Sequence, residues 1–110
     1  MPLSEKARVE VYVPDLPIAA YYRLLEQLEA EFIYNFGGCT LQRGLEGNYL
    51  SQTSEPIQDR VNLLYTDIPY SFTENLSLLS SFTDELRNRA AEALNEEAIL
   101  VVVMPVYHSE

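Results

Sequence analysis

The feature that most constrains the fold is an uncharged apolar run near the end of the chain, residues 98–106. Most of its residues are β-branched or large and apolar, which is typical of a strand covered on both faces. A buried helix can show the same pattern, but the β-branched content and the short length favour a strand. The rest of the chain can be read as material that covers it.

Length and composition indicate one folded domain without affinity for nucleic acid. The chain has 110 residues, of which 47% are hydrophobic, so we expect a single domain over residues 1–110 with a substantial core. Its formal net charge of −10 repels phosphate backbones. The basic residues are spread along the chain and form no local patch in the sequence, so we expect no nucleic-acid partner.

The chain contains one cysteine, Cys39, and one histidine, His108. A single cysteine excludes an intrachain disulfide and fits a reducing, cytoplasmic location. No residue spacing is typical of a zinc site, and no glycine motif predicts a phosphate site, so we expect no metal and no cofactor. No segment has the length of a membrane span and the first residues lack the apolar part of a signal peptide, so we expect no membrane association.

Hydrophobic periodicity predicts strands at residues 6–13, 39–45, 58–66 and 98–106, and helices at about 17–36 and 71–94. Asp15 or a neighbour is expected to cap the first helix, and Gly37 with Gly38 to end it. Ser71 or Thr73 is expected to cap the second helix, which can kink at residues 80–81.

The longest polar segment, residues 46–56, is expected to be the longest and most mobile loop, although residues 48–51 can prolong a hairpin. A turn is expected at residues 67–69.

This order of elements, with right-handed crossovers, predicts an α+β fold: one four-stranded antiparallel sheet with two helices on one face. It resembles the ferredoxin-like (βαββαβ) plait over nearly the whole chain, in element order and without a family motif. Small oligomeric domains of this shape include the PII-like signalling proteins and the dimeric α+β barrel monooxygenases. In the PII-like group the loop between strands two and three reaches for ligands and partners, and residues 44–56 occupy the corresponding place here.

Two arginines flank that predicted loop and form a candidate ligand site with Tyr49. Arg43 is expected to end the second strand and Arg60 to begin the third, so a hairpin would bring them near each other. Two guanidinium groups can grip a carboxylate or a phosphate. The alternative is that nearby acids neutralise both arginines in ordinary surface pairs; these acids are Glu46, Glu55 and Asp59.

Tyr12 is expected on the sheet face away from the helices. A tyrosine-lined sheet face can hold a flat ligand or form a subunit interface, and we favour the interface. The alternative function is therefore a small enzyme with a cavity on that face, lined by Tyr12, Arg8 or His108.

The last strand predicts self-association. Both of its alternating sets are apolar, and only one can face the helices. The two sets are Ile99, Val101, Val103 and Leu100, Val102, Met104. In the plait this strand lies at the sheet edge, where an uncovered apolar strand is a liability. We therefore expect a homo-oligomer, most simply a two-fold dimer. The favoured function is a non-enzymatic cytoplasmic oligomer that binds a partner protein or a small anionic ligand through the loop between strands two and three.

Overall fold

The computed structural model describes residues 2–96 and 99–109. The chain folds in the order strand, helix, strand, strand, helix, strand, with a short 3₁₀ turn before the second helix. The elements are β1 (Leu3–Pro14), α1 (Ala19–Phe36), β2 (Thr40–Leu50), β3 (Pro56–Ile68), η1 (Thr73–Asn75), α2 (Leu76–Leu94) and β4 (Leu100–Ser109).

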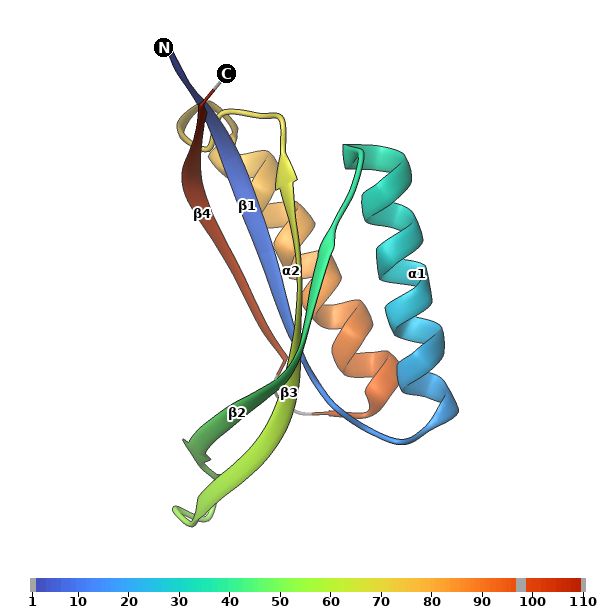
Figure 1. Cartoon of the computed structure of the whole chain (residues 1–110). Helices are drawn as coiled ribbons and strands as arrows, with labels where there is room; N and C mark the ends of the chain where they lie inside the picture. Colours follow the sequence, from blue (N-terminus) through green and yellow to red (C-terminus); the bar gives the residue numbers. More distant parts are fainter. Residues whose placement is uncertain (1, 97–98, 110) are drawn as a thin grey trace.

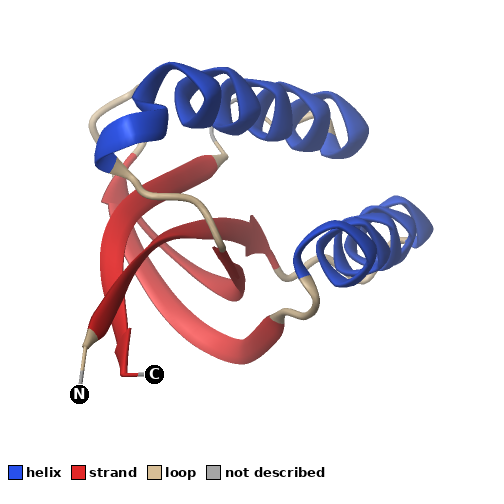
Figure 2. Cartoon of the chain, turned by 90° about the horizontal axis from the view of Figure 1, so that it is seen from above, coloured by secondary structure: helices blue, strands red, loops and turns tan. Residues whose placement is uncertain are grey.

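The four strands form one antiparallel sheet in the order β2-β3-β1-β4. Both helices cover the same face of this sheet, which is strongly twisted and curled (Figure 1, Figure 2). The crossovers place β1 and β3 in the centre and leave β2 and β4 at the edges. The predicted ferredoxin-like α+β fold is confirmed.

The core lies between the sheet and the helices. β1 alternates as predicted, and its inward residues are at most 1% exposed, because they sit in the middle of the sheet under both helices. Burial of each such aliphatic side chain is worth about 1.5–3 kcal/mol, so this layer is the main stabilising element. The core residues include Ala7, Val9, Val11 and Val13 of β1, Tyr21, Leu25, Leu28 and Phe32 of α1, and Leu79, Leu86, Ala90 and Leu94 of α2.

β4 covers most of the predicted last strand and continues past Val106 to Ser109. Pairing with β1 is unbroken up to Leu3 opposite Ser109, and the hydroxyl of Tyr107 donates to Glu5 at 3.3 Å. Polar cross-strand pairs therefore extend the strand beyond its apolar part. The start of the predicted strand, residue 98, lies outside the described residues.

The start of α1 differs from the prediction. The helix begins at Ala19 after Ile18, which makes no side-chain capping bond, so the predicted cap by Asp15 is wrong. The backbone N–H of Asp15 instead donates to the carbonyl oxygen of Arg60 at 2.9 Å, which ties this turn to β3. The predicted end is confirmed, since Gly37 caps the helix with a φ of +90° that favours glycine.

α2 passes through Ser80 and Ser81 as one continuous helix, so the weak pair of serines does not divide it into two. α2 begins at Leu76 after Asn75, whose side chain makes no capping bond, so the predicted cap by Ser71 or Thr73 is wrong. The hydroxyl oxygen of Ser71 accepts a hydrogen bond from the backbone N–H of Glu74 at 3.4 Å, ahead of the first α-helical turn.

The prediction of a long loop at residues 46–56 is wrong, and the alternative that residues 48–51 prolong a hairpin is correct up to Leu50. β2 continues to Leu50 and β3 begins at Pro56, which leaves residues 51–55 as the connection. The hydroxyl of Tyr49 donates to Asp59 across the two strands at 2.9 Å. Such polar cross-strand pairs stabilise a hairpin that has little apolar surface of its own.

The β2–β3 hairpin extends past the ends of both helices (Figure 1). We call this projecting part, residues 45–61, the hairpin arm. Most of its side chains are exposed, because neither helix covers them.

Candidate functional site

The sheet face opposite the helices, here called the open face, carries a mixed row of residues from three strands. In the pairing register, Arg8 lies opposite both Asp67 and Met104, and the alternation of each strand fixes which other residues share that face. Its members are Arg8, Glu10 and Tyr12 of β1, Leu63, Tyr65 and Asp67 of β3, and Leu100, Val102, Met104, Val106 and His108 of β4.

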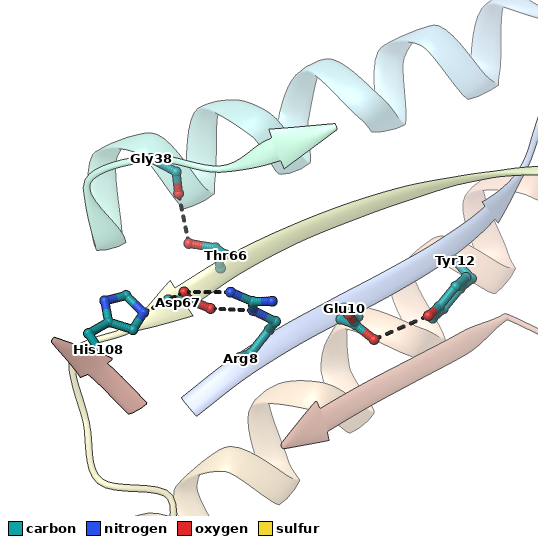
Figure 3. A network of polar contacts seen from close by, with 7 residues as sticks. All are labelled: Arg8, Glu10, Tyr12, Gly38, Thr66, Asp67 and His108. Atoms are coloured by element: carbon teal, nitrogen blue, oxygen red, sulfur yellow. Dashed lines mark hydrogen bonds and ion pairs between the residues drawn. The ribbon is translucent and has the colours of Figure 1, made fainter. Parts of the chain in front are cut away.

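One end of the open face is polar and tightly connected (Figure 3). The Nε of Arg8 donates to Oδ1 of Asp67 at 2.7 Å, and its Nη2 donates to Oδ2 at 3.0 Å. The Nε2 of His108 lies 2.7 Å from the same Oδ2. Asp67 therefore joins β1, β3 and the end of β4 through one carboxylate.

The electrostatics of this cluster favour the charged forms of Asp67 and Arg8. The hydrogen bonds from Arg8, together with the contact to His108, hold the pKa of Asp67 below its ordinary value despite partial burial. The same carboxylate raises the pKa of Arg8. The guanidinium of Arg8 also lies 4.5 Å from the ring centre of Tyr65, a cation–π distance. The arrangement is a structural clamp, since the bonding capacity of the arginine is directed at its neighbours.

Arg8, Tyr12 and His108 are the candidates predicted from the sequence to lie on this face. The structure brings Arg8 and His108 together through Asp67, but Tyr12 lies further along β1 and its hydroxyl donates to Glu10 at 3.2 Å (Figure 3). Burial raises the pKa of the Tyr12 phenol.

Asp67 was missed by sequence reasoning because residues 67–69 were predicted to be a turn, whereas β3 continues to Ile68. Extending the alternation of Leu63 and Tyr65 by one step would have placed Asp67 on the open face, beside Arg8.

The remainder of the open face is apolar along β4. Leu100 is 59% exposed, while Val102, Met104 and Val106 are half-buried. Val101 and Val103 belong to the other row of this strand, which faces the helices, and both pack against the core. No helix covers the outward row, because both helices lie on the other face (Figure 2).

The hairpin arm contains the predicted ligand residues Tyr49 and Arg60. Arg60 lines a surface hollow of about 610 Å³ at the base of the arm. Its side chain forms no ion pair with a carboxylate of the described residues. The hollow is lined by Asp15, Gly44, Leu45, Glu46, Gln58, Asp59 and Arg60.

The acids beside Arg60 have other partners. Asp59 accepts the hydrogen bond of Tyr49, which raises the pKa of that phenol. Glu46 lies opposite Arg60 in the register but accepts a hydrogen bond from the side chain of Gln58. The guanidinium of Arg60 is therefore left facing solvent.

Arg43 is not directly opposite Arg60. A break in register between Gln42 and Leu45 places it in a β-bulge, and it does not line the hollow. Both arginines were expected at the ends of a long loop, but both lie within the strands β2 and β3.

Cys39 is half-buried and packs against the core, and burial raises the pKa of its thiol. This is the environment of a structural cysteine and not of a reactive thiolate. Among residues 2–96 and 99–109, no group of three or more His, Cys, Asp and Glu side chains is placed to hold a metal ion. Neither of the described helices is long and apolar enough to span a bilayer.

Comparisons with known proteins identify the fold. No model of a known protein family matches the chain, and no curated protein does. Among solved structures, the chain is similar to CutA1 from Oryza sativa, with 20% identity and a TM-score of 0.59, covering 98% of this chain and 85% of that one. It is also similar to the divalent cation tolerance protein CutA1 from Thermus thermophilus, with 16% identity and a TM-score of 0.59, covering 96% and 87%. The chain therefore has the fold of the CutA1 structures, and the expected fold-level resemblance to small ferredoxin-like domains is confirmed.

Proposed function

We propose that the protein is a non-enzymatic homo-oligomer whose copies associate through the open face and the hairpin arm. The observation that carries this proposal is the outward apolar row of β4, from Leu100 to Val106, which neither helix covers (Figure 2) and which begins with the 59% exposed Leu100. The fold shared with small CutA1 proteins is consistent with such a module. The lone, structural Cys39 fits a cytoplasmic setting.

The arm adds three exposed apolar side chains, of which Tyr49 and Ile57 lie opposite each other and Leu50 faces the other side of the hairpin. Tyr49 is 50% exposed, Leu50 is 69% exposed and Ile57 is 36% exposed. A second copy of the chain can cover both the arm and the open face. Burial of each large apolar side chain is worth about 1.5–3 kcal/mol. A two-fold dimer is the simplest closed arrangement.

A matched pair of substitutions on β4 tests the association. Val102 faces outward opposite Glu10, which can pair with a new ammonium, so V102K is expected to dissociate the oligomer while leaving the fold intact. Val101 packs on the core opposite Val11, so V101K is expected to unfold the protein. Sedimentation and circular dichroism separate the two results. An oligomer unaffected by V102K would remove the open face from the proposed interface.

A second candidate role is the binding of a small ligand at the base of the arm, favoured by the solvent-facing guanidinium of Arg60. An exposed guanidinium in a hollow can take a carboxylate or phosphate group. The carboxylates of Asp15, Glu46 and Asp59 line the same hollow and disfavour a highly charged anion. We therefore propose a ligand with a single anionic group, held by Arg60. Arg43, which precedes Gly44 of the lining, and Tyr49, which is bonded to Asp59 of the lining, would complete the site from its margin.

Titration with acetate and with inorganic phosphate, followed by NMR shifts of the arm amides, tests this role. R60A is expected to abolish the shifts and R43A to weaken them. The exposed Arg23 on α1 provides the control, since R23A is expected to leave them unchanged. Equal responses in wild type and R60A would refute the ligand role.

The enzyme alternative has no support in the described residues. Arg8 and His108 are both held by Asp67, and Tyr12 lies apart from them with Glu10. The similar structure from Thermus thermophilus carries the name divalent cation tolerance protein, which raises the question of metal binding. For this chain we propose no resident metal, and calorimetry with Cu²⁺ and Zn²⁺ is expected to show no stoichiometric binding.

A further inference from the structure

The hairpin arm begins at a β-bulge in β2. Gln42 pairs with Leu63 and Leu45 pairs with Val61, so Arg43 and Gly44 together face a single residue of β3. Gly44 has a φ of +75°, a conformation that favours glycine. A bulge of this kind bends its strand and increases the local twist, so it sets the direction of whatever follows.

The residue opposite the bulge is Asn62, which is fully buried. Its Oδ1 accepts a hydrogen bond from the backbone N–H of Gly44 at 3.0 Å. Its side-chain nitrogen donates to the hydroxyl of Tyr21, which is 1% exposed and lies in the first turns of α1. A buried polar link thus connects the bulge to the helix layer.

Buried polar groups are costly without a partner, so each member of this link restrains the others. Beyond the link the arm has no helix above it (Figure 1). One further tie is the hydrogen bond from the backbone N–H of Asp15 to the carbonyl oxygen of Arg60 on the other strand of the arm. The base of the arm is therefore held at two points, Gly44 on β2 and Arg60 on β3. We call this base the junction.

We propose that Tyr21, Asn62 and Gly44 are positioning residues that fix the direction of the hairpin arm, and that this direction is required for self-association. The second part rests on the proposed function. A copy can bury the arm and the open face together only if the arm points in one direction, so loss of the junction should weaken association more than it weakens the fold.

Two glycines give a matched test. Gly44 and Gly37 both have positive φ, and open space surrounds the position of an added Cβ at each. G44A and G37A should therefore cause similar backbone strain, but only G44A lies at the junction. We expect G44A to raise the dissociation constant of the oligomer at least tenfold relative to G37A, at similar loss of thermal stability.

The hydroxyl link has its own matched pair. Y21F removes the hydroxyl that accepts the hydrogen bond of the Asn62 side-chain nitrogen, whereas Y22F alters a tyrosine that is 57% exposed. We expect Y21F to weaken association in the same direction as G44A, and Y22F to leave it unchanged. If G44A and Y21F associate as tightly as their controls G37A and Y22F, the proposed role of the junction in self-association is wrong.

A direct measurement of arm direction separates this inference from the proposed function. Spin labels on Asn48→Cys in the arm and Glu26→Cys on α1, in a Cys39→Ser background, report the distance between arm and body by electron resonance. The labelled protein is diluted with an excess of unlabelled protein, so that distances between copies do not contribute. We expect one narrow distance distribution, broadened by G44A and Y21F but not by G37A. An unchanged distribution would refute the junction, whereas a monomeric wild type with a broadened G44A distribution would refute only its role in assembly.

Discussion

At the scale of single residues, Asp67 has the most constrained environment of the charged groups on the open face. Its carboxylate accepts from Arg8 twice and contacts His108, and its side chain is only 17% exposed. Hydrogen bonds to charged groups contribute more to stability than exposed pairs do, because less solvent screens them. The ion pair between Asp84 and Arg87 on α2 is over half exposed on both sides and provides the contrast.

This contrast predicts a pH-dependent loss of stability in D67N. The pKa of Asp67 is lowered by folding, so its contribution is present above the ordinary aspartate range near pH 4 and is lost as the pH falls through the folded value. We expect D67N to lower the free energy of unfolding by roughly 1.5–3 kcal/mol at pH 7 and by much less at pH 3. Urea titrations at one protein concentration measure both.

The control is D84N, for which we expect a change within about 0.5 kcal/mol at either pH. A D67N variant as stable as wild type at pH 7, or equally destabilised at both pH values, would contradict the clamp.

At the scale of elements, alternation and helical spacing were enough to predict the order and type of all six main elements, because each buried face imposes its own period on the sequence. They were not enough for the arm, because its strands are held by polar pairs such as Tyr49 with Asp59, which have no hydrophobic period. The relation of Arg43 to Arg60 also escaped prediction, since it depends on the register break at Gly44.

The corrected arm predicts a specific pattern of amide exchange. We expect fast exchange at residues 51–55 and slower exchange at the cross-strand bonded amides of residues 46–50, because opening them requires breaking the hairpin ladder. Limited proteolysis should cut first within residues 51–55. Equally fast exchange across residues 46–55 would show that the arm strands are not formed in solution.

At the scale of the whole molecule, the chain combines uncovered apolar surfaces with a formal net charge of −10. Copies of such a chain repel each other at long range, and salt screens this repulsion. If the interface is apolar, raising the salt concentration from about 50 to about 500 mM should strengthen association. An interface built on ion pairs would weaken instead, so the sign of the salt effect on the dissociation constant distinguishes the two.

The central claim is that the outward row of β4 and the hairpin arm are covered by another copy of the chain. Sedimentation equilibrium of the wild-type protein at high micromolar concentration tests it most directly. The account predicts a mass that is a whole multiple of the 12.6 kDa chain, and a return to 12.6 kDa in V102K at unchanged helical circular dichroism. A wild-type protein that sediments as a 12.6 kDa monomer under these conditions would contradict it.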